Sequence, residues 1–348
     1  MSSLIRPPGH TSTDGFRAQL KRRPLLAVAT VLNLVLLAAA MGCASNQPAI
    51  AFSSDRDGNR EIYTVDPTTG DQKNLTESLA DEFSPTLSPD GKLVAFLSSS
   101  GEDIGIEVIE TGGEGRRPLS AGSGRYGSQQ WAPDGDRLAY IAEIEGRPAI
   151  YVGGIQGKPP LLLTTIRADE VSSWSPNGKS VAFSVRQGPE QGVYIRNPDG
   201  VNEFRLTDTP DYGPLWSPDS KRFAFISVRD GNPEIYVMNV DGSEQRRLTE
   251  SDAPEYDLSW SPNGDFLMFV TGMGPDAEIY ITDPDVAGHV RLTHNEVRDD
   301  QPVWSPNGRQ IAFVSYLDGD AEIFLMDSDG GEQTRLTNNE GDDISPSW

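Results

Sequence analysis

The sequence predicts an all-β protein, a seven-bladed β-propeller with four-stranded blades whose N- and C-terminal strands close the ring in one blade. One pattern recurs seven times between residues 49 and 348, and each copy contains four strand-like pieces. Gly and Pro contribute 35 and 26 of the 348 residues, which fits short strands joined by tight turns. Each copy has one marker position, which is Trp in six copies and Leu in one. The markers are Leu87, Trp131, Trp174, Trp216, Trp260, Trp304 and Trp348, and they are spaced by 44, 43, 42, 44, 44 and 44 residues.

Each copy is expected to form four short antiparallel strands. In one copy, a Ser-Pro-Asp-Ser turn at 217–220 is followed by an apolar run at 223–225 and a polar turn at 229–232. An alternating run at 234–238 and an Arg-Leu-Thr piece at 247–249 complete the copy. Alternation and aromatic or β-branched residues predict strands, and Gly, Pro, Asp and Asn at fixed offsets predict hairpin turns. No segment after residue 42 shows a convincing helical period.

The two ends of the repeat region predict how the ring closes. The region opens at residues 50–52 with a second strand, and it ends at residues 343–348 with a first strand. Together they make one complete blade, the seventh. A ring closed in this way leaves no free sheet edge, so it resists fraying and edge-to-edge aggregation.

The copies resemble the WD40-like repeat of TolB-type β-propellers, in which Trp-Ser-Pro-Asp-Gly-Lys, Ile-Ala-Phe, Glu-Ile-Tyr and Leu-Thr recur. The resemblance covers residues 49–348 and implies the fold far more specifically than the function. The family's propeller has six blades and follows an α/β domain. The sequence here predicts seven blades, and its strands begin within seven residues of Cys43.

The first 42 residues predict a bacterial export signal. Lys21, Arg22 and Arg23 precede an uncharged apolar stretch at 25–41, which ends next to Cys43, the one cysteine of the chain. This resembles a lipoprotein signal peptide, which implies cleavage before Cys43, a diacylglycerol on its thiol and a lipidated linker at 43–48. The alternative is an uncleaved signal anchor, because seventeen apolar residues are just long enough to span a bilayer. Both alternatives place the propeller in the bacterial cell envelope, outside the cytoplasm.

The charge balance excludes several classes of partner and site. The chain carries 29 basic and 52 acidic side chains, for a net charge of −23. Such acidity excludes an electrostatic hold on DNA, RNA or anionic lipid. A single cysteine excludes a disulfide framework and a cysteine-based zinc site.

An acidic column recurs five residues before each marker. If these positions lie at the mouth of a central channel, they form a ring of carboxylates that would bind Ca²⁺, Mg²⁺ or a basic partner. The alternative is a set of solvated loops whose Asp residues cap or turn the chain locally. Asp81, Glu170, Asp300 and Asp342 add further acids beside the column. Its six acidic members are Glu82, Asp169, Asp211, Glu255, Asp299 and Asp343, with Tyr126 at the seventh position.

Other motifs point to structure rather than chemistry. The repeated Trp is expected to pack between neighbouring blades, and the Pro-Asp/Asn-Gly motif is expected to form tight turns. The stretch Asp55–Glu61 invites a calcium-loop interpretation, but a hairpin turn fits its spacing better. There is no Gly-x-Ser-x-Gly elbow, and His289 and His294 flank the same short strand. The sequence therefore predicts no catalytic residue and no cofactor.

These observations predict a monomeric, membrane-tethered lipoprotein that acts as a binding or scaffolding propeller for a protein, peptide or glycan. The alternative is a propeller hydrolase or polysaccharide lyase that uses channel carboxylates for acid–base work. The second copy stands apart from the repeat, because residues 125–127 read Arg-Tyr-Gly where other copies carry acids. That copy is either a docking site or a position that has drifted.

Overall fold

The computed structural model describes residues 47–348 except 120–123, 145–146, 158, 167, 287 and 318. The chain divides into two compact units, Met1–Gln47 and Pro48–Trp348, and the fold below is that of the second. The predicted signal segment at 1–42 and the predicted lipidation site Cys43 lie outside the described residues. Within the described part of the chain, no helix is long and apolar enough to cross a bilayer.

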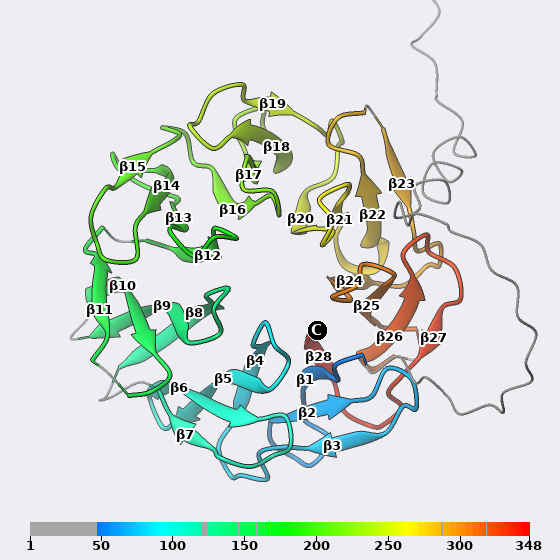
Figure 1. Cartoon of the computed structure of the whole chain (residues 1–348). Helices are drawn as coiled ribbons and strands as arrows, with labels where there is room; N and C mark the ends of the chain where they lie inside the picture. The colour runs from blue at the N-terminus through cyan, green and yellow to red at the C-terminus, as the bar shows by residue number, and fades with distance from the viewer. Residues whose placement is uncertain are drawn as a thin grey trace, which may run out of the picture. The chain divides into compact units, whose positions relative to one another are not determined.

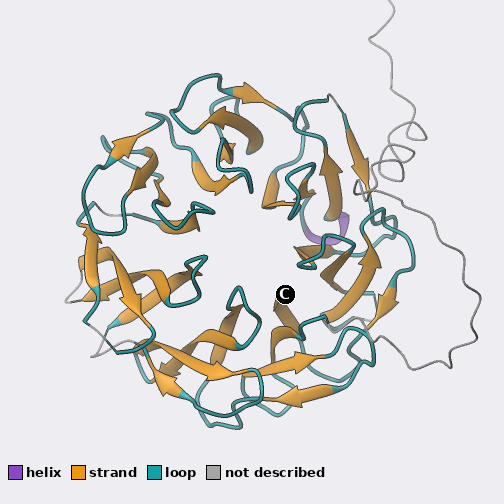
Figure 2. Ribbon diagram, in the orientation of Figure 1, coloured by secondary structure: helices purple, strands orange, loops and turns teal. Residues whose placement is uncertain are grey.

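The Pro48–Trp348 unit is all-β, with its sheets arranged around a common axis as in a propeller (Figure 1). Among the described residues the one helical element is the short 3-10 helix η1, Gly274–Asp276 (Figure 2). The strands nearest the axis are β4 (Glu82–Leu87), β8 (Arg125–Trp131), β12 (Glu170–Trp174), β16 (Tyr212–Trp216), β20 (Glu255–Trp260), β24 (Asp299–Trp304) and β28 (Asp343–Ser347).

Three further layers of strands follow outward from the axis. The second strands are β1 (Ile50–Ser54), β5 (Leu93–Ser100), β9 (Arg137–Ile144), β13 (Val181–Val185), β17 (Arg222–Ser227), β21 (Leu267–Thr271) and β25 (Gln310–Ser315). The third strands are β2 (Glu61–Val65), β6 (Asp103–Glu110), β10 (Arg147–Gly154), β14 (Gly192–Arg196), β18 (Glu234–Asn239), β22 (Glu278–Thr282) and β26 (Glu322–Asp327). The outer strands are β3 (Gln72–Asn74), β7 (Arg117–Pro118), β11 (Leu161–Thr164), β15 (Phe204–Arg205), β19 (Arg246–Arg247), β23 (His289–Arg291) and β27 (Thr334–Arg335).

Neighbouring strands within each unit pair antiparallel, so the prediction of four antiparallel strands per copy is confirmed. Four sheets have the simple orders β12-β13-β14-β15, β16-β17-β18-β19, β20-β21-β22-β23 and β24-β25-β26-β27. The units β4–β7 and β8–β11 are joined into one larger sheet by a single parallel pair, Ile104 with Arg125. The remaining sheet has the order β28-β1-β2-β3, with Ser54 of β1 opposite Asp343 of β28.

The hydrophobic core lies between adjacent sheets. Strands β1 and β2 are buried on both faces because a sheet packs against each side of them. On one side, Ile50 and Phe52 pack with Val314 and Ile323. On the other side, Ala51 belongs to the cluster of Val94 and Phe96 of the following sheet. Full burial of one such side chain contributes about 2–3 kcal/mol, so these contacts hold the sheets together.

The predicted turns between first and second strands are confirmed. In the first of them, the Gly91 amide donates to the Ser88 carbonyl at 2.8 Å. Gly91 has a φ of 69°, which glycine adopts without a side-chain clash. The Asp90 carboxylate accepts hydrogen bonds from the Ser88 hydroxyl and the Lys92 amide at 2.8 and 3.1 Å. Ser, Asp and Gly at these offsets therefore build the turn locally.

The tryptophan markers link neighbouring sheets, as predicted for a structural role. The Trp131 indole N–H donates to the Thr86 carbonyl of the preceding sheet at 2.9 Å. Trp174 donates in the same way to the Gln130 carbonyl at 3.0 Å. At the C-terminus, Trp348 donates to the Pro48 carbonyl at 2.9 Å. Trp131 and Trp174 thus bond to the preceding unit, whereas Trp348 bonds to the segment before β1 of its own sheet. The indole N–H groups of Trp216 and Trp304 are buried without a hydrogen-bond partner among the described residues, so packing of the ring is what these markers share.

Candidate functional site

The predicted acidic column lies where the sequence placed it, at or just before the start of the innermost strands. The expectation that its carboxylates face solvent is wrong for five of the six members. Only Asp169 is exposed. The five that are at most 1% exposed are Glu82, Asp211, Glu255, Asp299 and Asp343.

Three of the buried carboxylates are neutralised by arginines of the same sheet. Arg229 donates to Asp211 at 2.7 Å, and Arg56 donates to Asp343 at 2.7 Å. Both arginines come from the loop between the second and third strands. Glu82 receives a hydrogen bond at 2.6 Å from an arginine of a different loop, Arg116, which precedes the outer strand β7. Each arginine therefore tethers a loop to the start of its inner strand.

The other two buried carboxylates rely on neutral donors. Glu255 accepts hydrogen bonds from the Thr249 hydroxyl and, at 3.2 Å, from the Ile235 amide. Burial, together with the nearby charge of Glu234, raises the pKa of Glu255 to about 7. Asp299 accepts a hydrogen bond from Asn295 at 2.7 Å, and burial raises its pKa.

These contacts give the five buried members a structural role in the fold. Among the described residues, no group of three or more His, Cys, Asp or Glu side chains lies in an arrangement that could hold a metal ion. That the column binds a cation or a basic partner stays a prediction, and Asp169 is its one solvent-facing member. Its carboxylate accepts a hydrogen bond from the Arg186 amide at 2.6 Å.

The stretch Asp55–Glu61 forms a hairpin turn, as the spacing favoured. The Gly58 amide donates to the Asp55 carbonyl at 2.9 Å, and Gly58 has a φ of 103°. The Asn59 amide group donates to the Ala80 carbonyl at 2.8 Å and so fixes the turn to the following loop. Asp57 accepts a hydrogen bond from the Tyr63 hydroxyl rather than pointing toward a common centre with Asp55.

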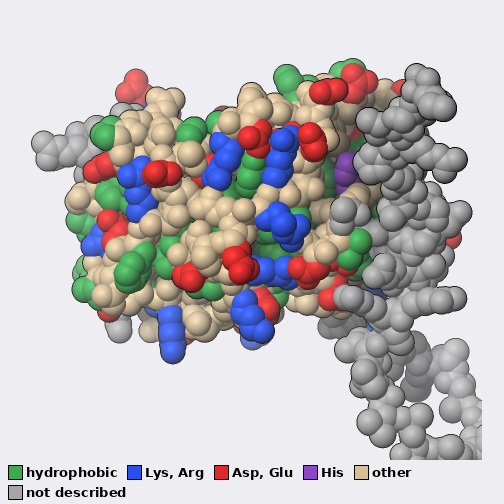
Figure 3. Space-filling view, turned by 90° about the horizontal axis from the view of Figure 1, so that it is seen from above, with side chains coloured by type: hydrophobic (Ala, Val, Ile, Leu, Met, Phe, Trp, Pro, Cys, Tyr) green, Lys and Arg blue, Asp and Glu red, His purple; other side chains and the backbone are tan. Residues whose placement is uncertain are grey.

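A second set of ion pairs fastens the outer strands to the third strands. Arg247 donates to Glu234 at 2.7 Å, and Arg335 donates to Glu322 at 2.6 Å. The face of the unit shown in Figure 3 accordingly displays basic and acidic side chains interspersed rather than separated. The acidic excess of the chain is therefore partly compensated by local pairs.

The β8–β11 unit lacks this ionic pattern, as its departure from the repeat indicated. Ala149 and Leu162 stand where β18 and β19 carry Glu234 and Arg247. Its interior instead holds a tyrosine series in which the Tyr140 ring lies 6.0 Å from Tyr126 and 6.2 Å from Tyr151. Both partners of the ion pair are replaced together, so neither charge is left unpaired.

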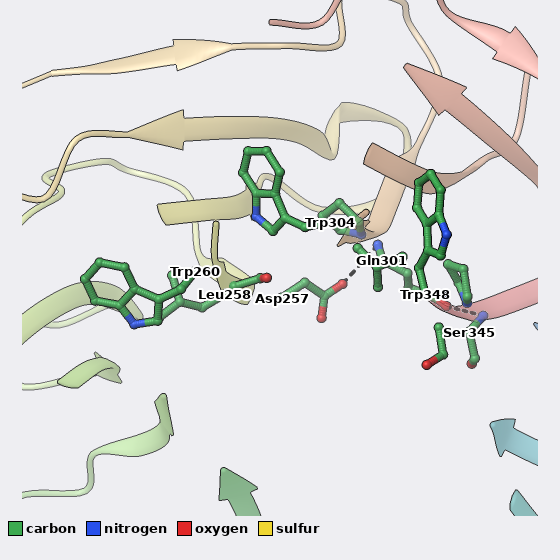
Figure 4. A pocket seen from close by; sticks show the side chains of 12 residues that line it. Asp257, Leu258, Trp260, Gln301, Trp304, Ser345 and Trp348 are labelled. Carbon is green, nitrogen blue, oxygen red and sulfur yellow. Dashed lines mark hydrogen bonds between the residues drawn. The ribbon is translucent and has the colours of Figure 1, made fainter. Parts of the chain in front are cut away.

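A central pocket of about 560 Å³ opens on the innermost strands β20, β24 and β28. Its walls come from equivalent segments of the three strands, which are 257–260, 301–304 and 345–348. Figure 4 shows Asp257, Gln301 and Ser345 in a row along this wall, with Trp260, Trp304 and Trp348 behind them. The pocket therefore combines three polar side chains from equivalent positions with an apolar background.

A β-bulge in each innermost strand creates this polar row. The bulge shifts the register between the first and second strands, for example between Tyr256 and Ser259 of β20. Six of the bulge residues adopt the left-handed conformation, with φ between 50° and 60°: Ser84, Ser128, Gly213, Asp257, Gln301 and Ser345. Such a bulge re-aims the side chain that it carries.

Hydrogen bonds join the row across the sheets. The backbone N–H of Gln301 donates to the Asp257 carboxylate at 3.1 Å, and the backbone N–H of Ser345 donates to the side-chain carbonyl of Gln301 at 2.7 Å (Figure 4). Each side chain is thus oriented by the backbone of the next sheet.

Asp257 is the one acidic residue among these six left-handed bulge residues. Its side chain is exposed to solvent on the pocket wall. The protein around the pocket lowers the hydration of the carboxylate and, together with the charge of Asp300, raises the pKa of Asp257 to about 6. Sequence reasoning missed it because the acidic column drew attention to the strand starts. The signal lay two residues after the acidic column, where Asp257 is the one acidic residue among Ser, Gly, Gln and Val.

Asp300 stands beside the pocket and is paired. Arg298 donates to its carboxylate through Nε at 2.5 Å, and burial raises the pKa of Asp300. The Arg298 guanidinium lies 5.3 Å from the centre of the Tyr316 ring. Because Asp300 is already neutralised by Arg298, Asp257 carries the negative charge that the pocket offers to a ligand. A carboxylate on a pocket wall can bind ammonium or guanidinium groups.

Three comparisons with known proteins agree on the family and the fold. The family model described as the TolB beta propeller domain matches residues 38–211 and 209–315. A Tol-Pal system protein TolB from Francisella tularensis subsp. tularensis (strain WY96-3418) is 26% identical over 151 residues, which cover 42% of this chain and 34% of that protein. The aligned region therefore spans about a third of that relative.

Solved structures share the fold at low sequence identity. The crystal structure of TolB from Acinetobacter baumannii has a TM-score of 0.60 and 20% identity, covering 86% of this chain and 66% of that one. An oligogalacturonate lyase in complex with manganese has a TM-score of 0.65 and 16% identity, covering 79% of this chain and 84% of that one. Likeness at this identity shows the fold alone, so the hydrolase or lyase alternative stays open.

Proposed function

Because the chain belongs to the TolB beta-propeller domain family, we propose that it is a membrane-tethered binding protein of the bacterial cell envelope whose propeller captures a segment of a partner protein. The Francisella relative is named as a component of the Tol-Pal system, which supports a protein as the ligand class. The proposal takes the partner to be a protein or peptide rather than a glycan.

The central pocket is the proposed binding site, and the carboxylate of Asp257 is the observation that carries the proposal. Asp257 is the one acidic residue among the six left-handed bulge residues, and Arg298, whose charge reaches it, forms its ion pair with Asp300 instead. Asp257 accepts one amide hydrogen bond from Gln301, and its pKa of about 6 leaves it ionised at neutral pH. We infer that a Lys or Arg side chain of the partner enters the pocket and pairs with it.

We further propose that the ring has seven blades and is closed through β28. The proposal counts β4–β7 and β8–β11 as separate blades, because a single residue pair joins them. The antiparallel pairing of β28 with β1 and the shared apolar cluster of β1, β2, β25 and β26 support closure by both termini.

The proposed tether is the N-terminal segment, with cleavage after residue 42 and a lipid on Cys43. The basic cluster, the apolar stretch and the position of the lone cysteine support it. A tether would keep the binding pocket at the surface of the membrane, outside the cytoplasm.

The binding proposal is tested with the full chain, an array of short extended peptides, and an Asp257→Asn variant. Peptides that bind are remade with norleucine in place of each Lys or Arg, and affinities are measured by fluorescence anisotropy. We expect Asp257→Asn to weaken binding of the basic peptides about two- to fivefold, because the Lys or Arg of the peptide loses an ion-pair partner near solvent. Norleucine replacement should weaken binding to the wild type by a similar factor.

The pH dependence gives an independent readout of the same contact. Asp257 becomes protonated as the pH falls through about 6, so binding to the wild type should weaken between pH 7.5 and pH 5. Asp257→Asn should show no such change. The control is Glu102→Gln, which removes one exposed charge from the turn between β5 and β6. Equal binding by the wild type, Asp257→Asn and Glu102→Gln would exclude the central pocket as the site.

A further inference from the structure

Exposed apolar side chains gather at one place on the rim of the unit. Leu161 and Leu162 of β11, Val201 of the turn before β15, and Phe204 of β15 are all exposed. They make up half of the exposed large hydrophobic residues among those described. We call these four residues the rim patch. Figure 1 shows that β11 and β15 occupy neighbouring places on the perimeter.

Contacts between the two sheets make the rim patch continuous. A Cβ added to Gly200, in the turn before β15, would lie 3.3 Å from the Leu162 carbonyl oxygen. The Thr164 hydroxyl of β11 donates to Glu203 at 3.1 Å. The turn that carries Val201 therefore rests directly against β11.

Three other outer strands carry charged side chains at the Leu161 position, whereas β15 and β23 carry Phe204 and the buried Val290 there. Lys73, Arg117 and Arg246 stand where β11 has Leu161, and Arg247 stands where it has Leu162. Charged residues and very short strands are the usual protection of an exposed sheet edge. Strand β11 has neither, since it is four residues long and begins with three leucines. An unprotected apolar edge of this kind marks a surface that contacts another apolar phase.

The rim patch adjoins a pocket and has both acidic and basic side chains beside it, among them Asp136 and Arg205. A pocket of about 310 Å³ lies beside Leu161, between Val152, Pro159 and Pro198. Two nearby arginines are already paired, Arg137 with Asp134 at 2.6 Å and Arg196 with Glu203 at 2.7 Å. An apolar edge without a cluster of basic side chains suits the interfacial region of a lipid bilayer without any requirement for anionic lipid.

The rim patch lies toward the face at which the chain enters the unit. Strands alternate in direction, so turns between first and second strands share a face with turns between third and outer strands. Pro48 is on this face, because a Cβ added to Gly91 in the β4–β5 turn would lie 3.1 Å from Pro48. Pro159, Pro198 and Val201 occupy or adjoin turns of the same face. The five peptide units from Cys43 to Pro48 span at most about 18 Å.

We propose that the rim patch seats the propeller on the bilayer, with Leu161, Leu162, Val201 and Phe204 in the interfacial region of the membrane that holds the N-terminal segment. The inference rests on the membrane tether proposed above. A short linker on one face holds that face close to the bilayer, and the rim patch determines which edge touches it. The opposite face, where the loops between second and third strands lie, then points away from the membrane.

The test is lipid-contact quenching on the full chain reconstituted in vesicles. Two single variants, Leu162→Trp and Leu79→Trp, add one tryptophan each to the full chain. Leu79 is the matched control, because it is fully exposed and lies between β3 and β4 on the opposite face. The emission added by each tryptophan is compared in vesicles of phosphatidylcholine and of dibrominated phosphatidylcholine.

We expect the brominated lipid to quench the tryptophan of Leu162→Trp and to leave that of Leu79→Trp unchanged. Quenching should persist at high salt and should not increase when anionic lipid is added, since the contact is apolar. Absence of quenching in a protein that still floats with the vesicles would overturn the seating while leaving the tether intact. Equal quenching of both variants would also overturn the proposed seating. A blue shift that grows with protein density but does not depend on bromination would overturn it in favour of contact between copies of the protein. Loss of flotation itself would instead refute the tether.

Discussion

Buried carboxylates are the most unusual residues of the molecule. Sequence reasoning located the acidic column but not its environment, because partners such as Arg116 of Glu82 and Arg229 of Asp211 lie 34 and 18 residues away. Arg56 and Arg229 stand at equivalent positions and make equivalent contacts, but Arg116 comes from a different loop, so the repeat does not show which carboxylates are paired. Charge patterning alone therefore cannot distinguish a solvated ring from a set of buried ion pairs.

Glu255 is the residue whose titration should affect stability most clearly. Its pKa is near 4.5 when exposed and about 7 in the fold. The unfolded chain therefore loses its proton first as the pH rises, so Glu255 lowers stability progressively between about pH 4.5 and pH 7. We expect Glu255→Gln to be more stable than the wild type at pH 8, by up to roughly 3 kcal/mol, and similar to it below about pH 5.

Urea unfolding at several pH values checks this expectation. Asp169→Asn is the control, because Asp169 is the exposed member of the column, and it should change stability by a few tenths of a kcal/mol at every pH. A Glu255→Gln variant that is destabilised equally at pH 5 and pH 8 would contradict the raised pKa.

At the scale of secondary-structure elements, the strands and turns that could be predicted are those specified by short local sequence motifs. Turns of Ser, Pro, Asp and Gly and runs such as Val94–Leu97 specify their own conformation, so the strands and hairpins were predictable from the repeat. The bulges of the innermost strands were not. Ser, Asp and Gln seldom adopt a φ near 50°, and they do so here because neighbouring sheets hold the bulge in place.

Strand β28 is the element whose removal should be most damaging. Deletion of residues 343–348 removes the partner of β1, the ion pair of Asp343 with Arg56 and the hydrogen bond from Trp348 to Pro48. We expect the truncated protein to unfold at lower temperature, over a broader range, and to aggregate through the exposed edge of β1. Calorimetry and light scattering measure both effects.

The Trp348→Ala variant distinguishes the contribution of strand β28 to stability from that of the Trp348 side chain. This variant keeps β28 but loses a half-buried indole, so it should cost about 1–3 kcal/mol, less than a fully buried Trp, and preserve a sharp transition. A truncated protein that melts at the wild-type temperature would show that β28 contributes nothing to the closure of the ring.

For the whole molecule, the proposed export signal and tether at the N-terminus determine the predicted location of the propeller. The composition of the N-terminal segment made an export signal predictable, whereas the choice between a cleaved lipoprotein and a signal anchor depends on enzymes that act on Cys43. We expect Cys43→Ser to release the protein from membranes or to block its processing. Fractionation with immunoblotting measures location and size together.

The two forms of tether give opposite results in that experiment. A Cys43→Ser protein that stays in the membrane fraction at unchanged size would identify residues 25–41 as an uncleaved anchor. The proposed orientation of the rim patch would hold in both cases, because either anchor ends within a few residues of Pro48.

At the bulge near the axis, the fold requires a particular backbone conformation but not a particular side chain, and it is the side chain that faces the central pocket. Ser, Gly, Asp and Gln occupy that position at nearly the same φ, so the backbone accepts different side chains there without rearrangement. The cost of the left-handed conformation, about 1 kcal/mol for a residue other than Gly, is similar for each of them. A single codon change at such a position would therefore alter the chemistry of the central pocket while leaving the sheets untouched. The fold in effect offers a row of exchangeable recognition positions, and new specificities can arise one residue at a time.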